Sequence, residues 1–393
     1  MKLLVIGCGQ CGGRIADEFA RLKRRAHAQR GIDIVTNPLA INTDIADLTG
    51  LSFIKPDYQH RILVGGQKTG GHGVGKINEL GAEIAKEDAD KILESIKRTR
   101  HFHEIDAFLL IASAAGGTGS GVIPIITQYL KEYYAEKPSY NLIVLPFKHE
   151  ETVEERTIYN TATCLKSAYL VADAIFLIDN QRYVRKDFSI QANLAKINAL
   201  VVEPFYNLLC AGEEKKAKYI GARMLDAGDI MQTVAGWTVI GYGKSQTPLF
   251  RFPLGRMLDF RDKTSESRRG SDAMNDAINE LSLKCNPSDA KRALYLLSGP
   301  PQEMNMSLLS EIGNSLKHAA TDAIIRSGDY PREKHTVSVT LILSDLVNVG
   351  RVMEYFTEAI HYISSHKKRW GEIEYEHRGI EEAPSSNKVG NTP

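Results

Sequence analysis

Six short apolar runs in the first half of the chain constrain its fold more than any other feature of the sequence. They are bounded by turn residues and do not alternate with polar positions: Leu3–Ile6, Leu39–Ile41, Ile62–Val64, Ala107–Ile111, Leu142–Leu145 and Ala174–Ile178. Such runs are typical of strands that are covered on both faces. Longer segments with helical spacing separate them: Arg14–Ala28, Leu80–Ile96, Val122–Tyr134 and Thr157–Val171. This alternation predicts an α/β fold with a doubly wound parallel sheet.

The second half of the chain has a different pattern. Ile190–Cys210 carries an apolar stripe at helical spacing and predicts one long central helix that connects two domains. Beyond it, the patterns predict strands at Thr238–Tyr242, Arg292–Leu297 and Thr336–Leu343, and helices at Ser271–Leu283 and Met306–Lys317. Because alternate residues of the last strand are apolar, we expect a smaller α+β C-terminal domain whose sheet has one exposed face.

The length of 393 residues is sufficient for two domains and a tail. We expect the first domain to span 1–188, the central helix 189–212 and the C-terminal domain 213–365. The tail, 366–393, ends in a segment rich in Pro, Ser, Asn and Gly, which predicts disorder there.

The composition limits the kinds of partner and compartment. A formal net charge of +1 provides no basic field for nucleic acid or an anionic membrane. No apolar stretch approaches the ~20 residues that span a bilayer, and Gly7–Gly13 interrupt the N-terminal apolar run too early for a signal peptide. Five cysteines are few and odd in number, and Cys8 and Cys11 have no second pair, so we expect free thiols without zinc. These features predict a cytoplasmic protein with no membrane span.

Three glycine-rich turns follow predicted strands and carry the main evidence for a ligand: Gly7–Gly13, Gly70–Gly75 and Ala115–Gly121. A turn of this kind lets backbone N–H groups and a helix N-terminus face an anion. The first turn alone satisfies G-x-G-x-x-G, so an NAD-dependent oxidoreductase is the alternative interpretation. Three such turns at the carboxyl edge of one sheet instead favour a nucleoside triphosphate.

The same residues resemble the tubulin/FtsZ superfamily of GTPases. Gly116–Gly121 resembles the signature G-G-T-G-[ST]-G, and Gly9–Gly12 is similar to the first phosphate loop of tubulins. Asn42–Asp44 resembles the N-T-D of FtsZ, and Gly71–Gly75 its third loop. The mixture of tubulin-like and FtsZ-like loops looks most like the archaeal CetZ group.

The resemblance implies that the chain binds GTP or GDP with Mg²⁺ at the sheet edge. It places the α- and β-phosphates on the first loop, Gly9–Gly12, and the β- and γ-phosphates on the fourth loop, Gly116–Ser120. Val74 and Gly75 of the third loop would contact the γ-phosphate. Asp44 would approach Mg²⁺ through water, although Asn42 or Asp44 could instead form a local Asx turn. The residues of these loops that the resemblance implies for cofactor binding are Gly9, Gln10, Cys11, Gly12, Arg14, Asn42, Asp44, Val74, Gly75, Ala115, Gly116, Gly117, Thr118, Gly119 and Ser120.

The resemblance also assigns the nucleoside. Asn180 and Asn198 match the two asparagines that read guanine, since an amide both donates and accepts hydrogen bonds. Leu194 stands one helical turn before Asn198, where relatives often carry an aromatic residue that stacks on the base. Glu150, or alternatively Glu154 followed by Arg156, would contact the ribose.

Asp226 and Asp229 resemble the paired aspartates of the family's synergy loop, here 224–230. In that family the loop reaches the γ-phosphate held by the next subunit, which implies hydrolysis at a subunit interface by carboxylates that position water. The implied protein is a cytoskeletal GTPase that assembles head-to-tail with itself and controls cell shape or division. A GTP-binding scaffold without turnover is a further alternative, and no motif identifies an anchoring or regulatory protein.

Overall fold

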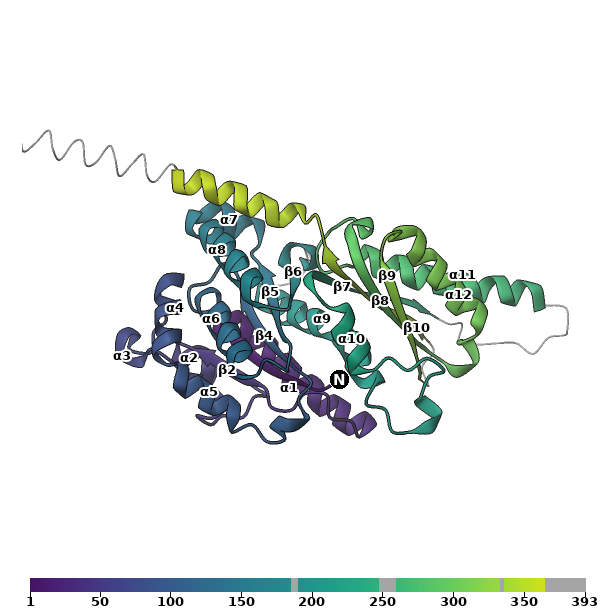
Figure 1. Cartoon of the computed structure of the whole chain (residues 1–393), viewed down its shortest axis with the longest axis horizontal. Helices are drawn as coiled ribbons and strands as arrows, with labels where there is room; N and C mark the ends of the chain where they lie inside the picture. Colours follow the sequence, from purple (N-terminus) through teal and green to yellow (C-terminus); the bar gives the residue numbers. More distant parts are fainter. Residues whose placement is uncertain (185–189, 247–258, 333–335, 365–393) are drawn as a thin grey trace, which may run out of the picture.

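The computed structural model describes residues 1–184, 190–246, 259–332 and 336–364, and these form one ten-stranded sheet with helices on both faces (Figure 1). The strand order is β3-β2-β1-β4-β5-β6-β7-β10-β8-β9. The strands are β1 (Leu3–Cys8), β2 (Leu39–Asn42), β3 (Arg61–Leu63), β4 (Ala107–Ser113), β5 (Ser139–Leu145), β6 (Ala174–Asp179), β7 (Gly236–Gln246), β8 (Ala290–Gly299), β9 (Ile324–Pro331) and β10 (Thr336–Leu346).

The first six strands are all parallel, which confirms the predicted doubly wound α/β arrangement. Their order changes direction between β1 and β4, and such a switch point opens a crevice beyond the carboxyl ends of the strands. Consecutive residues of β1 enter different hydrophobic clusters: Leu3 and Val5 belong to one face of the sheet, and Leu4 and Ile6 to the other. Burial on both faces explains why the sequence of these strands does not alternate.

Helices cover both faces of this half of the sheet. Leu80–Ile96, which we expected to be one helix, forms two helices separated at Asp88. Asp88 leaves the helical conformation and its carboxylate accepts a hydrogen bond from the Gly65 amide at 2.6 Å. The helices of this half are α1 (Gly9–Arg30), α2 (Ile45–Thr49), α3 (Gly66–Thr69), α4 (Asn78–Glu87), α5 (Ala89–Lys97), α6 (Thr118–Tyr133), α7 (Lys148–Val153) and α8 (Glu155–Val171).

The C-terminal half continues the same sheet through β7, which pairs in parallel with β6 and antiparallel with β10. Its helices are α9 (Ile190–Ala211), α10 (Ala227–Thr233), α11 (Asp259–Asn279), α12 (Met306–Ala319) and a last helix at 350–364. The edge strand β9 and the helix at 350–364 were not predicted from the sequence. The smaller α+β part and the long helix before it are present as expected.

The prediction that the C-terminal sheet has an exposed face is wrong. Ser338 and Thr340, the polar positions between the apolar residues of β10, are 6% and 1% exposed. Helices α11 and α12 pack on one face, while Ile342 joins the cluster that contains α9 on the other. The small hydroxyl side chains can be buried because backbone carbonyls accept their hydrogen bonds, as when Ser338 Oγ donates to the Ser298 carbonyl.

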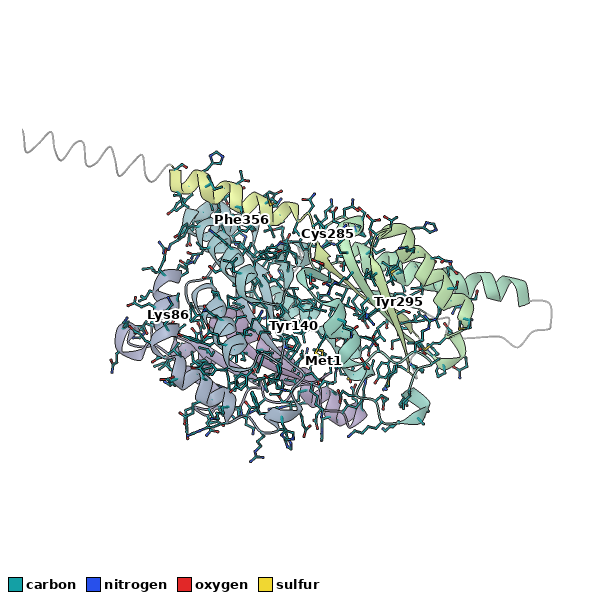
Figure 2. The ribbon with its side chains drawn as sticks, viewed as in Figure 1. Met1, Lys86, Tyr140, Cys285, Tyr295 and Phe356 are labelled. Atoms are coloured by element: carbon teal, nitrogen blue, oxygen red, sulfur yellow. The ribbon has the colours of Figure 1, made fainter. Side chains whose placement is uncertain are left out.

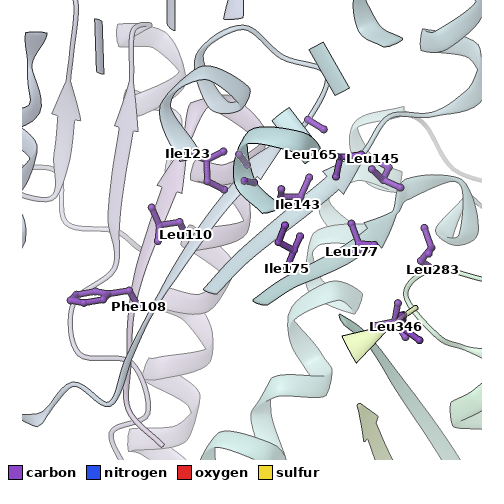
Figure 3. Close-up of a cluster of buried hydrophobic side chains, with 14 of the residues drawn as sticks. Phe108, Leu110, Ile123, Ile143, Leu145, Leu165, Ile175, Leu177, Leu283 and Leu346 are labelled. Atoms are coloured by element: carbon purple, nitrogen blue, oxygen red, sulfur yellow. The ribbon is translucent and has the colours of Figure 1, made fainter. Parts of the chain in front are cut away.

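The hydrophobic core is continuous across the two halves. Figure 3 shows Leu110, Ile143 and Leu177 of the parallel strands in one cluster with Leu283 and Leu346 of the C-terminal half. Figure 2 labels Met1 and Tyr140, which belong to the cluster on the opposite face of the sheet. Among the residues described, no helix is sufficiently long and apolar to cross a bilayer.

Helix α9 runs from the carboxyl edge of the parallel strands to their amino edge. Near its end, the Leu209 carbonyl accepts a hydrogen bond at 3.1 Å from the amino group of Met1, just before β1. That amino group also pairs with Glu213 at 2.9 Å. At ~1.5 Å per residue, the 22 residues of α9 span roughly 33 Å.

Candidate functional site

A pocket of about 330 Å³ lies at the carboxyl ends of β1, β4, β5 and β6, where the sheet order changes direction. Most of the predicted ligand-binding residues line it. They are Gly9, Gln10, Cys11, Arg14, Asn42, Asp44, Ala115, Gly116, Gly117, Thr118, Gly119, Glu150, Asn180, Leu194 and Asn198.

Two long helices begin at this pocket and make one end of it suitable for phosphate. Helix α1 begins at Gly9 and α6 at Thr118, and no side chain caps the N-terminus of either helix. The first backbone N–H groups of both helices therefore remain available to an anion, at the positive ends of two helix dipoles. The two loops pack directly on each other, because a Cβ atom on Gly9 would lie 2.8 Å from the Gly119 amide nitrogen. Gly9 also has a φ of +72°, which only glycine adopts easily.

The buried side chain of Asn160 holds the third and fourth loops together. Its Nδ2 donates to the carbonyls of Lys76 at 2.9 Å and Ala115 at 3.1 Å. The fourth loop is also joined to the second, since the hydroxyls of Thr43 and Thr118 lie 2.7 Å apart in the interior. The three loops thus form one preorganised cradle. Asn160 lies inside a helix far along the chain, and no local sequence signal marks it.

In the second loop, Asn42–Asp44, the side chains of Asn42 and Asp44 both accept local backbone hydrogen bonds, which was the alternative to ligand binding. Asn42 Oδ1 accepts from the Thr43 amide at 2.8 Å, and Asp44 caps α2 by accepting from the Asp47 amide at 3.0 Å. Asp47, which was not predicted, also lines the pocket and accepts hydrogen bonds from Gln10 Nε2 at 2.6 Å and Asn42 Nδ2 at 3.1 Å. The loop therefore presents two carboxylates to the phosphate end of the pocket.

These oxygen ligands fit Mg²⁺. Asp44, Asp47 and the Thr118 hydroxyl are hard donors on one side of the pocket, and Mg²⁺ is usually held by one or two carboxylates, waters and substrate phosphates. Within the described part of the chain, no group of three or more His, Cys, Asp or Glu side chains is placed to hold a metal. The ion would therefore depend on the nucleotide for the remainder of its ligands.

The opposite end of the pocket is lined by Phe147, Glu150, Asn180, Leu194 and Asn198. Phe147 and Glu150 begin α7, where the Glu150 carboxylate accepts a hydrogen bond at 3.0 Å from the Phe147 amide. Asn180 directly follows β6, and Leu194 and Asn198 lie one turn apart on α9. Amide and carboxylate groups on a partly apolar wall suit a nucleoside.

The thiol of Cys11 lies at the floor of the pocket. Burial, together with the nearby Glu150 charge, raises the pKa of Cys11 to about 12. Burial also raises the pKa of Cys8. Both cysteines are free thiols and are held in the uncharged form at neutral pH.

The structure does not bring five of the predicted ligand-binding residues into the pocket lining: Gly12, Val74, Gly75, Ser120 and Arg156. A Cβ atom on Gly12 would lie 2.0 Å from the Ile111 carbonyl oxygen, so this glycine permits close packing of α1 on β4. Val74 is buried beside Gly117, and Ser120 donates to the Gly116 carbonyl.

Arg156 is directed to the third loop. Its Nε donates to the Lys76 carbonyl at 3.0 Å, and its guanidinium pairs with Glu79. Glu154, the alternative ribose acid, pairs with Lys76. Of the two acids, Glu150 is therefore the one that faces the pocket. Residues of the lining that sequence reasoning missed are Cys8, Asp47, Gly73, Lys76, Ser113 and Phe147.

Asp226 and Asp229 lie far from this pocket, beyond the other end of α9. They form a reciprocal cap at the start of α10: the Asp229 amide donates to Asp226 at 2.9 Å, and the Asp226 amide to Asp229 at 3.4 Å. Asp229 also pairs with Arg326 of β9 at 2.7 Å. Asp226 is exposed to solvent. Neither carboxylate can act on a ligand in the pocket of its own molecule.

Comparisons with known proteins match both halves of the chain. Residues 2–186 match the Tubulin/FtsZ family, GTPase domain, and residues 187–361 match the Tubulin-like CetZ, C-terminal domain. Tubulin-like protein CetZ1 from Haloferax volcanii is 33% identical over 92% of each chain. Tubulin-like protein CetZ from Pyrococcus furiosus is 29% identical, over 87% of this chain and 85% of its own.

Solved structures of relatives share the fold. The GDP-bound monomer of CetZ1 from Haloferax volcanii superposes with a TM-score of 0.79 at 30% identity, covering 92% of this chain and 99% of that one. The GTPγS-bound protofilament of CetZ2 from the same organism gives 0.78 at 25% identity, covering 93% and 100%. These matches leave the oxidoreductase alternative without support. Together with the cradle of phosphate loops, they show that this chain belongs to the CetZ group of the tubulin/FtsZ family and is a GTPase.

Proposed function

We propose that this GTPase assembles head-to-tail into protofilaments and hydrolyses each bound GTP with residues of the next subunit. The observation that carries this proposal is the position of Asp226 and Asp229 relative to the pocket. Asn198 lines the pocket in the first half of α9, while the two aspartates follow the C-terminal end of this helix, which lies roughly 20 Å of helix beyond Asn198. A site divided between opposite ends of one subunit is completed when identical subunits stack in a heterologous, non-closing contact.

Within the pocket, the phosphates lie over the N-termini of α1 and α6, on Gly9, Gln10 and the 115–119 loop. Asp44 and Asp47 would hold Mg²⁺, which would neutralise part of the phosphate charge. Lys76, which was missed from the sequence, also lines the pocket, and its ammonium group pairs with Glu154.

The nucleoside occupies the other end of the pocket. Asn180 and Asn198 hydrogen-bond the guanine edge, Leu194 packs against the base, and Glu150 accepts from the ribose hydroxyls. An adenine base presents the opposite donor and acceptor pattern and would leave buried amide groups unpaired, which favours GTP over ATP.

The chemistry of the interface is general-base positioning of water. Asp226 is exposed and free to accept a proton or a hydrogen bond from a water molecule aimed at the γ-phosphorus of the neighbouring nucleotide. Asp229 holds α10 in place through its cap and its pair with Arg326. Hydrolysis then depends on assembly, and the nucleotide state controls filament lifetime.

A mixing experiment tests whether the site is shared. Asp226→Asn keeps an intact pocket, whereas Gly116→Trp should fill the pocket and keep an intact loop. A Cβ atom on Gly116 meets nothing within 4 Å, so the new ring can enter the pocket without displacing the backbone. Gly117 is a less suitable position, because a Cβ atom there would lie 2.6 Å from the Val74 side chain and a tryptophan would distort the phosphate loop.

Each variant alone should release little phosphate. A mixture of the two should regain hydrolysis, up to about a quarter of the wild-type rate at equal amounts, because one interface in four pairs an intact pocket with an intact loop. A mixture that is no more active than its components would contradict catalysis in trans.

The filaments we propose are cytoplasmic and serve cell shape or division.

A further inference from the structure

The helix at 350–364 crosses the molecule from the C-terminal half to the nucleotide half. Figure 1 shows this helix in yellow, lying along α7 and α8, and Figure 2 labels Phe356 on it. Phe356 packs against the hydrophobic cluster that also contains β4 and β5. Tyr362 near its end contacts Tyr159 of α8, with ring centroids 5.8 Å apart. The C-terminal half thus contacts the helices next to the pocket, α7 and α8.

Arg351 and Tyr355, one turn apart on this helix, both bind Glu151 of α7. The Arg351 guanidinium pairs with the Glu151 carboxylate, and the Tyr355 hydroxyl donates to the same carboxylate oxygen. Arg351 also donates to the Tyr355 hydroxyl at 2.9 Å and lies over its ring. The arginine and glutamate side chains are only 15% and 12% exposed. Water therefore screens this ion pair less than a surface pair.

Helix α7 has little else to fix its position. It has six residues, none of them buried, and Val153 at its end is 78% exposed. A helix of this length without an apolar face is not stabilised by hydrophobic packing. Besides the Glu151 contacts, the Lys148 amide of α7 donates a hydrogen bond at 3.3 Å to the side-chain oxygen of Gln181, next to Asn180 of the pocket. The His149 ring also stacks on Phe147, which directly precedes the helix, with centroids 5.5 Å apart.

Glu150 precedes Glu151 in the same helical turn and faces the pocket. Any rotation or lift of α7 moves both residues together, since the backbone between them is rigid within the turn. We infer that Arg351 is a positioning residue for nucleotide binding: by clamping Glu151, it sets where the Glu150 carboxylate meets the ribose. The inference rests on the proposed ribose contact of Glu150.

The test compares the affinity for GTP with that for 2′,3′-dideoxy-GTP, which lacks the ribose hydroxyls. The wild type should bind the dideoxy nucleotide at least about tenfold more weakly, the scale of one charge-assisted hydrogen bond. Glu150→Gln, which keeps the helix cap, should lose most of this discrimination. Arg351→Met should lose it too, by weakening GTP binding about tenfold while changing dideoxy-GTP binding little.

Matched variants separate positioning from general damage. Glu151→Gln breaks the same clamp from the other side and should resemble Arg351→Met, whereas Arg351→Lys should restore part of the discrimination. Glu354→Gln is the control, because Glu354 binds the outer side of Arg351 and is 59% exposed. That variant should behave as the wild type.

The outcomes are distinct. If Arg351→Met weakens both nucleotides equally, or keeps full discrimination, the positioning role is refuted while the ribose contact stands. If the wild type itself does not discriminate between the two nucleotides, the ribose contact fails, and the role of Arg351 fails with it. GTP binding and assembly-dependent hydrolysis would be unaffected by that result.

Discussion

Replacing Asp226 separates the helix cap that its carboxylate forms from the catalytic role that we propose for it. Asp226 caps α10 by accepting the Asp229 amide at 2.9 Å, and its exposed position makes it the proposed base for the neighbouring subunit's nucleotide. Asparagine retains the capping oxygen but cannot accept a proton, while alanine loses both functions. Loss of an N-cap costs about 1 kcal/mol of stability, and loss of a catalytic base costs ~10² to 10⁴ in rate.

We therefore expect Asp226→Asn to unfold at the same urea concentration as the wild type, and Asp226→Ala to unfold earlier by the equivalent of about 1 kcal/mol. Both variants should bind GTP with wild-type affinity, form longer-lived filaments and release phosphate ~10² to 10⁴ times more slowly. Urea titration, calorimetry and phosphate release measure these quantities.

Asp229→Ala is a less specific test, since it also leaves Arg326 without its partner at 2.7 Å. Two results would refute the reasoning. One is wild-type hydrolysis by Asp226→Asn. The other is a rate per molecule in the wild type that stays constant as the protein is diluted well below the concentration at which filaments form.

Four further predictions concern the pocket itself. Asn198→Leu should weaken GTP binding by about 1 to 3 kcal/mol and leave ATP binding unchanged, as measured by calorimetry; equal losses for both nucleotides would contradict guanine recognition. With the pKa of Cys11 at about 12, its alkylation should be slow at neutral pH and rise about tenfold per pH unit up to pH 10, and bound GTP should slow it. Glu150→Gln removes a negative charge that disfavours the thiolate, so it should lower the pKa of Cys11 and speed alkylation; an unchanged rate would place Glu150 elsewhere. Asn160→Ala should weaken GTP binding and lower stability by about 1 to 3 kcal/mol, because it removes the bond to Lys76 and takes away the hydrogen bond to the buried carbonyl of Ala115; wild-type values in urea titration and calorimetry would contradict the cradle.

The sequence predicts the parts of this molecule that have local signals. Buried parallel strands are short apolar runs, and phosphate loops need glycine where two backbones approach, as at Gly9 and Gly119. Both features can be recognised without any knowledge of distant contacts. They were sufficient to predict the parallel sheet and the phosphate end of the pocket.

What the sequence did not predict depends on tertiary contacts. Lys76, Asp47 and Asn160 come together from a turn and two helices, and nothing near them in the sequence marks this convergence. The edge strand β9 contains Gly328 and Pro331, and only three of its eight residues are buried, so it lacks a strand pattern. The exposed sheet face was expected because Ser and Thr alternate with apolar residues in β10, yet these small hydroxyls are buried.

Strand β7 belongs to both halves of the sheet, and this has a mechanical consequence. Its first residues pair with β6 and the rest with β10, so no flexible segment separates the two halves along that strand. In the proposed protofilament, a pulling force enters at the loops on one end of the subunit and leaves at α10 on the other. The force then runs along the strands, while the hydrogen bonds of each ladder run across them, perpendicular in the antiparallel ladders and slanted in the parallel ones. Such bonds are loaded together in shear instead of being unzipped one at a time. A filament built this way should break between subunits before any subunit unfolds.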